Sequence, residues 1–105
     1  MSDRLAAARD YVSRKPTDRF GLYALAMELR KIKSYEECFA AFDALLVAHP
    51  NYAAGYYHYG AACKESGDRV RCIATLRRGL DAATRSGDAH TRAEIEGLID
   101  ELEGE

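Results

Sequence analysis

The sequence predicts an all-α protein built from stacked pairs of antiparallel helices. When the chain is shifted against itself by 34 residues, residues of similar kind coincide: Pro16 with Pro50, Leu22 with Tyr56, and Cys38 with Cys72. Self-similarity at that period is typical of repeated helix-turn-helix units. Within each repeat, apolar residues recur at three- and four-residue spacing, as they do on the buried side of a helix. Prolines and the Gly67-Asp68 pair separate these stretches, so we expect about six helices.

The repeat resembles the tetratricopeptide repeat. In that family a large apolar residue opens the first helix, a small residue follows four positions later, and another small residue lies early in the second helix. These places are held by Leu22, Ala26 and Cys38 in one unit, and by Tyr56, Gly60 and Cys72 in the next. The resemblance covers residues 19–84 directly, and it implies a short right-handed α-solenoid that binds other proteins.

We expect one domain over residues 1–105, with an N-terminal half-repeat helix at 3–15, a first repeat at 18–50, a second at 51–86 and an acidic capping helix at 88–103. Residues 5–16 are in register with residues 39–50. The first helix should therefore correspond to the second helix of a unit whose first helix is absent. Terminal repeats need polar outer faces, which the acidic last helix would supply.

Polar residues that cap helices precede the apolar stretches. Three helix starts are predicted on this basis: at Asp18, at Ser34 with Glu37 as a capping box, and at Asp88 or at Thr91 with Glu94 as a second capping box. The Gly67-Asp68 pair should form the turn inside the second repeat, and Gly87 should end its second helix.

Helical periodicity also predicts the buried side of each helix. The expected core residues are Leu5, Ala8, Tyr11, Val12, Leu22, Leu25, Ala26, Leu29, Cys38, Phe39, Phe42, Leu45, Leu46, Tyr56, Tyr59, Gly60, Cys63, Val70, Cys72, Ile73, Leu76, Leu80, Ile95, Leu98, Ile99 and Leu102. Gly79 departs from the repeat pattern, because glycine inside a helix costs about 1 kcal/mol relative to alanine unless a neighbour needs the space. No proline closes the second repeat, so we expect this unit to be looser or longer than the first.

Composition limits the classes of protein that fit. Three cysteines without secretory features indicate reduced thiols that act as small apolar residues. The N-terminus has an early acid and no apolar signal segment, and no apolar run approaches the roughly 20 residues that cross a bilayer. We therefore expect a cytoplasmic protein. Residues 1–85 carry 14 basic and 10 acidic side chains, whereas residues 86–105 carry one Arg and seven acids.

Motifs for catalysis or cofactor binding are missing from the sequence. The glycines are dispersed and none precedes a Lys-Ser or Lys-Thr pair, so no phosphate-binding loop is predicted. His49, His58 and His90 have no partner at a spacing that puts two metal ligands on one helix face. No nucleophile has a base in reach. The sequence therefore predicts no enzyme, no metal and no cofactor.

The resemblance places ligands on the concave surface formed by the first helices. Residues of those helices that turn away from the core are Phe20, Tyr23, Ala24, Met27, Arg30, Tyr57, His58, Ala61 and Lys64. Aromatic rings beside a basic edge suit a partner peptide with apolar anchors and an acidic end. Family members that clamp a C-terminal carboxylate use Lys and Asn where this chain has Tyr23, Met27 and His58, which favours a more apolar ligand.

Three hypotheses for function follow. The leading one is a non-catalytic adaptor that binds a partner segment beside Tyr23 and Tyr57, although these tyrosines also fit a role in packing between first helices. The second is a self-assembling scaffold, because two full units are below the usual minimum of about three. The third and weakest is nucleic-acid binding through the basic side chains Arg69, Arg71, Arg77 and Arg78.

Overall fold

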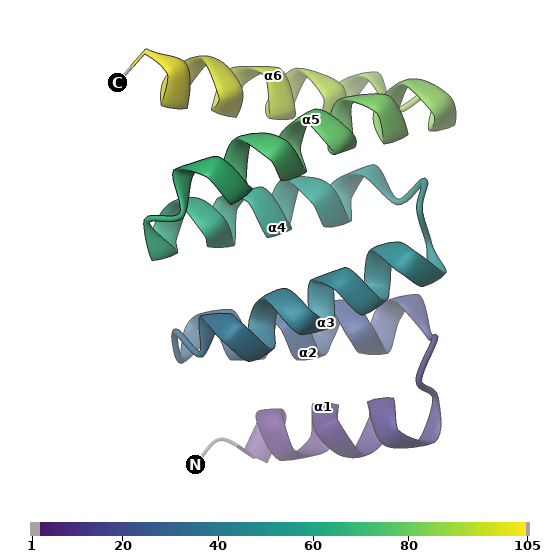
Figure 1. The fold of residues 1–105 in the computed structure, drawn as a ribbon. Helices are drawn as coiled ribbons and strands as arrows, with labels where there is room; N and C mark the ends of the chain where they lie inside the picture. Colours follow the sequence, from purple (N-terminus) through teal and green to yellow (C-terminus); the bar gives the residue numbers. More distant parts are fainter. Residues whose placement is uncertain (1–2, 105) are drawn as a thin grey trace. The chain divides into compact units, whose positions relative to one another are not determined.

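A computed structural model describes residues 3–104, which fold into six α-helices (Figure 1). The helices are α1 (Asp3–Arg14), α2 (Arg19–Lys31), α3 (Tyr35–Ala48), α4 (Ala53–Ser66), α5 (Arg69–Ser86) and α6 (Ala89–Glu103). No β-strand occurs in this part of the chain. The predicted all-α class with about six helices is confirmed.

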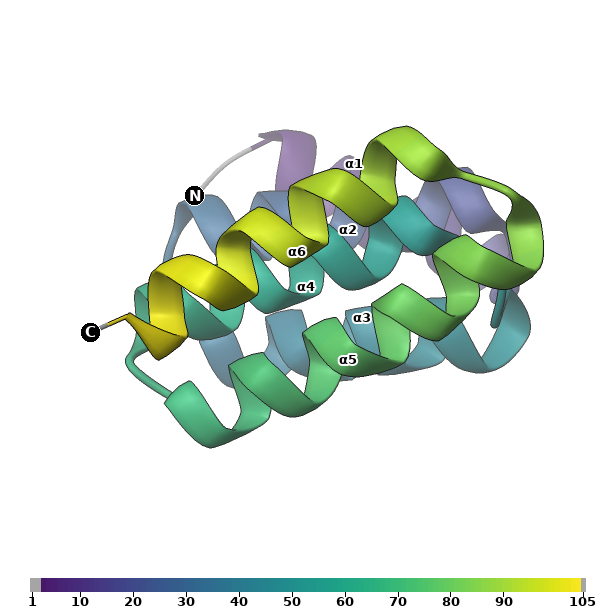
Figure 2. The same ribbon diagram turned by 90° about the horizontal axis from the view of Figure 1, so that it is seen from above.

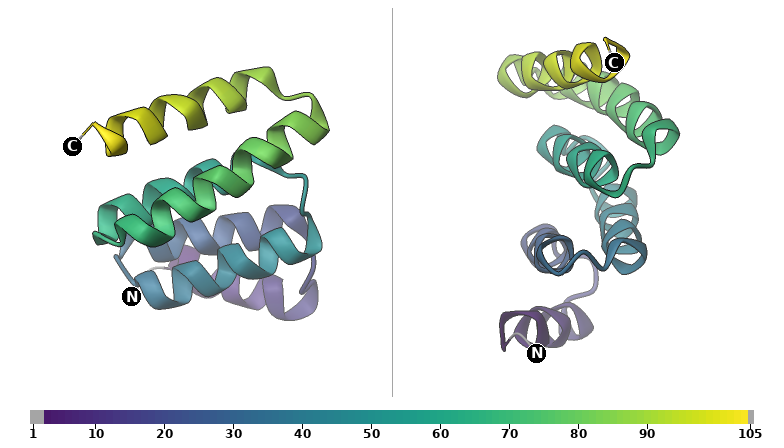
Figure 3. Two further views of the ribbon diagram at one scale, coloured as in Figure 1. Left: turned by 45° about the horizontal axis from the view of Figure 1, so that its top comes forward. Right: turned by 90° about the vertical axis from the view of Figure 1, so that its left-hand side faces the viewer.

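The chain divides after His49 into two compact units of three helices each. In the first unit, α2 packs against both α1 and α3. In the second unit, α5 packs against both α4 and α6, and α6 also touches α4. Figures 2 and 3 show α6 running beside α5 in this second unit. Each unit thus contains one complete helical hairpin and one additional helix.

Aspartate caps begin three of the helices. The Asp18 carboxylate accepts a hydrogen bond from the Gly21 amide at 2.8 Å and caps α2. Asp68 caps α5 in the same way, and Asp88 caps α6 by accepting from the Thr91 amide at 3.0 Å. The predicted start at Asp18 and the Gly67-Asp68 turn are confirmed. Of the two starts weighed for the last helix, Asp88 is the correct one.

The capping box predicted at Ser34 and Glu37 is wrong, although α3 does begin there. The Ser34 side chain makes no capping hydrogen bond. Its amide, which a capping box would direct to Glu37, instead donates to the Leu29 carbonyl at 3.0 Å. The Glu37 carboxylate is consequently available to Arg9 of α1, whose guanidinium lies 2.7 Å away. This contact lowers the pKa of Glu37, mainly through the hydrogen bond from Arg9.

The same thiol contact recurs in both units at the repeat spacing. Cys38 Sγ donates to the Ala26 carbonyl at 3.3 Å in the first unit, and Cys72 Sγ donates to the Gly60 carbonyl at 3.1 Å in the second. All three cysteines are buried thiols, as predicted. A Cβ at Gly60 would lie 2.6 Å from Leu76 Cγ, so the small residue lets α4 and α5 approach closely.

Gly79 is explained by the packing around it. A Cβ there would lie 2.7 Å from Tyr56 Cβ and 2.9 Å from Ile95 Cδ1, so neighbouring side chains occupy the space that a larger residue would need. Helix α5 continues for 18 residues, four more than α3, and ends at Gly87 in the left-handed conformation with φ of 70°. The stop at Gly87 was predicted, and of the two outcomes expected for this unit, looser or longer, the helix is longer.

The prediction that Val70 is buried is wrong, because its side chain is 83% exposed. Val70 precedes Cys72 by two residues, which places it about 200° around a helix with roughly 3.6 residues per turn. The buried side of α5 passes through Cys72, Thr75 and Leu76, so Val70 lies opposite it. Most other predicted core residues are buried, while Tyr11, Val12, Leu25, Ile73, Leu80 and Leu98 are half-buried.

Candidate functional site

In the first unit, the predicted ligand-binding residues lie along α2. Phe20 is 75% exposed, and Tyr23, Ala24, Met27 and Arg30 are each half-buried. Residues three and four apart lie on the same side of a helix, so these side chains form one continuous strip. The strip combines aromatic, thioether and guanidinium groups, as the sequence predicted.

An apolar pocket of about 320 Å³ lies between α1 and α2. Its lining residues are Arg4, Ala7, Ala8 and Tyr11 from α1, and Phe20, Gly21, Ala24 and Glu28 from α2. Two of the predicted residues, Phe20 and Ala24, line it, whereas Tyr23, Met27 and Arg30 do not. The wall supplied by α1 was missed at the sequence level. The signal that could have located this wall was the repeat register, which aligns α1 with the second helix of each repeat.

A small network holds the Tyr11 end of this pocket in place. The Tyr11 hydroxyl donates to Asp18 Oδ2 at 3.2 Å, and the same carboxylate caps α2. A Cβ on Gly21 would lie 2.5 Å from Tyr11 Cδ1, so the glycine makes room for the ring. The Gly21 amide is the main reason that the pKa of Asp18 is lowered, and the Tyr11 hydroxyl adds to the effect.

In the second unit, the predicted residues lie on α4. Tyr57, His58, Ala61 and Lys64 are all half-buried, and the Tyr57 and His58 rings meet edge to face with centroids 5.3 Å apart. Lys64 Nζ lies 2.7 Å from Glu101 Oε1 of α6. Lys64 also borders a second hollow of about 190 Å³ with Gly67, Arg69 and Leu102. The cation proposed to bind a partner's carboxylate therefore already pairs with a carboxylate of its own unit.

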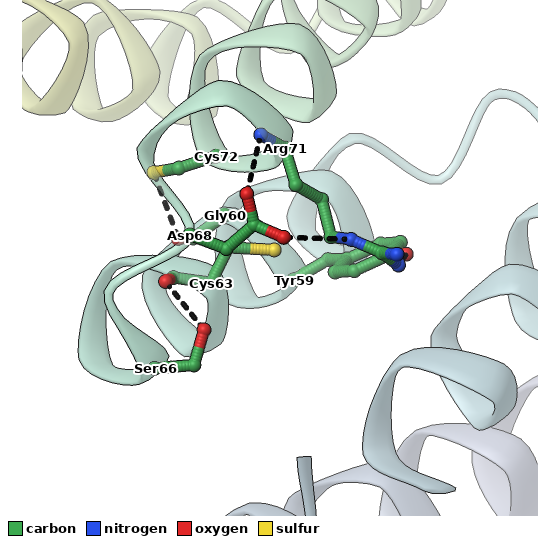
Figure 4. A network of polar contacts seen from close by, with 7 residues as sticks. All are labelled: Tyr59, Gly60, Cys63, Ser66, Asp68, Arg71 and Cys72. Atoms are coloured by element: carbon green, nitrogen blue, oxygen red, sulfur yellow. Dashed lines mark hydrogen bonds and ion pairs between the residues drawn. The ribbon is translucent and has the colours of Figure 1, made fainter. Parts of the chain in front are cut away.

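Arginines of α5 make contacts inside the second unit. Figure 4 shows Arg71 extending toward Tyr59 of α4, where its guanidinium donates to the hydroxyl at 3.1 Å. Arg71 also pairs with Asp68 at 3.3 Å. Arg77 pairs with Glu103, and the Arg78 guanidinium lies over the Tyr56 ring. Three of the four arginines considered for nucleic-acid binding are thus engaged by neighbours in their own unit.

Between Asp3 and Gly104, no three His, Cys, Asp or Glu side chains come together as a group that could hold a metal ion. Within the same range, none of the six helices combines the length and the apolar character needed to span a membrane.

Comparison with known proteins places the fold. No family model and no curated protein sequence matches this chain. The solution NMR structure of a tetratricopeptide repeat domain protein from Salinibacter ruber is 29% identical over 85% of this chain and 90% of that one, with a TM-score of 0.78. The crystal structure of the Salinibacter ruber tetratricopeptide repeat domain protein is 29% identical over 83% of this chain and 97% of that one, with a TM-score of 0.73.

A third solved structure supports the fold alone. The solution structure of a protein from Bordetella parapertussis has a TM-score of 0.80 at 18% identity, covering 97% of this chain and 89% of that one. The 34-residue repeat, the recurring thiol contact inside each hairpin and the Salinibacter structures lead to one conclusion. The chain has the fold of tetratricopeptide repeat domain proteins and is similar to them over most of its length.

Proposed function

We propose that this chain is a non-catalytic protein-interaction module that binds a segment of a partner protein along α2 and α4, the first helix of each repeat. One observation carries the proposal. Leu22 and Tyr56 are buried at 2% and 4% exposure, whereas the next residue in each helix, Tyr23 or Tyr57, keeps part of its ring at the surface. A large, partly exposed aromatic side chain thus recurs at the repeat spacing.

The surrounding side chains suggest the chemistry of the partner. Tyrosine offers a wide contact area with one polar tip, and Met27 adapts its shape to an apolar anchor. Arg30 and Lys64 add a positive charge near the end of each first helix. A partner carboxylate that binds Lys64 would displace Glu101, so the lysine would exchange one carboxylate for another and would remain paired. The partner segment is therefore expected to carry apolar anchors and an acidic end.

The test compares two double variants as immobilised baits in lysate, followed by affinity measurement with the purified partner. Tyr23→Ser with Tyr57→Ser should abolish binding and leave helicity by circular dichroism unchanged. The control is Tyr35→Ser with Tyr52→Ser, which removes two half-buried tyrosines that are outside the proposed surface. Equal retention by both variants, or loss of the fold in the first, would contradict the proposal.

Self-association is a second candidate, supported by large apolar side chains on the surface. Val47 and Val70 are each 83% exposed, and Phe20 is 75% exposed. Exposed apolar residues that gather on one face mark interaction sites, although single ones are common. Sedimentation across a wide concentration range distinguishes the two candidates. A monomer at every concentration would remove self-association and leave the adaptor proposal intact.

A further inference from the structure

The α1–α2 pocket corresponds by repeat register to a surface that is covered elsewhere in the chain. Its four α1 residues are Arg4, Ala7, Ala8 and Tyr11. One repeat later the same positions are Cys38, Ala41, Phe42 and Leu45, and two repeats later they are Cys72, Thr75, Leu76 and Gly79. All eight of these later residues are buried. In α1, by contrast, Arg4 and Ala7 are exposed and Tyr11 is half-buried.

The first helix of each hairpin is what covers those later residues. Cys38 donates a hydrogen bond to the Ala26 carbonyl of α2. Cys72 donates one to the Gly60 carbonyl of α4, and Leu76 packs against the same glycine. Gly79 lies against Tyr56 of α4. Helix α1 has no first helix of its own among residues 3–104. We propose that the α1–α2 pocket binds one amphipathic α-helix of a partner protein, in the place that a first helix takes in the two complete hairpins.

Within the described residues, α6 of a second copy does not suit the pocket. Helix α6 is considered because it is the one described helix that is not followed by a second helix within residues 3–104. Its apolar side is already used, because Thr91, Ile95, Ile99 and Leu102 are at most 8% exposed. Its exposed side carries the acids Glu94, Glu96 and Asp100. Burying those carboxylates in an apolar pocket would be costly, so a helix of another protein is the occupant that fits.

The pocket also indicates the composition of that helix. A volume of about 320 Å³ is near the lower end of the roughly 300–1,000 Å³ typical of binding pockets, so it accepts a few small or medium apolar side chains. Arg4 stands where the later repeats have buried Cys38 and Cys72, and no hydrogen bond or ion pair joins its side chain to another described residue. Glu28, the other charged lining residue, pairs with Lys31 at 3.1 Å. A carboxylate on the partner helix would therefore pair with Arg4.

The position of that carboxylate follows from the complete hairpins. Cys38 and Cys72, the counterparts of Arg4, contact Ala26 and Gly60, which lie past the middle of their first helices. A longer arginine side chain extends farther than a thiol. The acid should therefore lie in the second half of the partner helix, about one turn beyond the contact point.

The probe is a fluorescent peptide with the sequence of residues 19–31, held helical by a side-chain staple on its outer face and carrying Arg30→Glu. Its control keeps Arg30. Fluorescence anisotropy with the full chain should show the Glu peptide binding roughly fivefold more tightly than the control. In the Arg4→Gln chain that preference should disappear. No binding of either peptide, or the same preference without Arg4, would overturn the proposal.

A matched pair of variants locates the site. Ala7→Trp should fill the pocket and weaken binding roughly tenfold, whereas Ala6→Trp, on the same helix but outside the pocket, should not. The Tyr23→Ser/Tyr57→Ser chain should bind the probe like the wild type, which separates this inference from the proposed function. Equal loss in both Trp variants would overturn it. So would a wild-type dimer that Ala7→Trp dissociates, since the occupant would then be a second copy.

Discussion

Lys64 on α4 and Glu101 on α6 join the first and last helices of the second unit, with Nζ and Oε1 2.7 Å apart. Both side chains are partly exposed, at 36% and 60%, and exposed ion pairs contribute little to folding. In the proposed function the pair matters more, because Glu101 would compete with a ligand carboxylate for Lys64.

Glu101→Gln tests that competition. The change should alter the free energy of unfolding by less than about 1 kcal/mol, as measured by urea denaturation, because the pair is solvated. It should tighten binding of an acidic-ended partner segment, because Lys64 no longer has to exchange its carboxylate. Asp81→Asn makes the same change of charge on the exposed side of α5 and should leave that affinity unchanged.

Gly79→Ala should destabilise the protein although alanine is the better helix former. The new methyl group would lie 2.7 Å from Tyr56 Cβ, and overpacking of this kind costs about 1–3 kcal/mol, more than the gain in helix propensity. Gly97→Ala is the control, because nothing lies within 4 Å of a Cβ there, and it should stabilise α6 by up to about 1 kcal/mol. Equal stabilisation by both changes in thermal or urea unfolding would contradict the packing seen around Gly79.

The three thiols should react only when the protein opens. Cys38, Cys63 and Cys72 are fully buried, and two of them are held against backbone carbonyls across their hairpins. Alkylation followed by mass spectrometry should show labelling of the native protein at least about a hundredfold slower than in denaturant. Rapid labelling of Cys38 without the other two would show instead that the α2–α3 hairpin opens locally.

Stability should fall in acid partly because of the cap at Asp18. Its pKa is lowered in the folded state, so the stability it adds is complete above the ordinary value of 3.8 and is lost as the pH falls through the folded value. Asp18→Asn keeps a neutral acceptor that caps at any pH. Denaturation midpoints measured from pH 6 to pH 2.5 should therefore fall less steeply below pH 3.8 for Asp18→Asn than for the wild type. Parallel curves would show that this carboxylate does not contribute to acid unfolding.

Local sequence information was sufficient for the helices but not for every contact at their ends. Asp18 and Asp88 cap where predicted because a carboxylate can reach an amide three residues ahead without help from distant parts of the chain. Ser34 and Glu37 have the correct spacing for a capping box, yet the Ser34 amide bonds to Leu29 and Glu37 pairs with Arg9. The competing partners come from other elements, so spacing alone could not reveal them.

The predictions of burial also succeeded where the repeat pattern was sufficient and failed where the packing of a helix was needed. The repeat register correctly predicted Cys38 and Cys72, because equivalent small residues face the same neighbour in each hairpin. Val70 was wrongly predicted to be buried, because only its apolar character was considered. Its position around the helix axis of α5 turns it away from α4 and α6. Among the predicted binding residues, Phe20 and Ala24 line the α1–α2 pocket, and the surface formed by the others remains a prediction.

By itself, the sequence determined the all-α class, the repeat of 34 residues and the order of the helices, because these depend on periodicity and on short-range capping. Only the tertiary structure decided that Lys64 pairs with Glu101 and that Tyr56 and Ile95 fill the space beside Gly79. It also decided that a pocket lies between α1 and α2. Each of those contacts depends on how far one helix lies from another and which side it turns toward its neighbour. Those quantities are set by packing of the whole unit, not by any single stretch of residues.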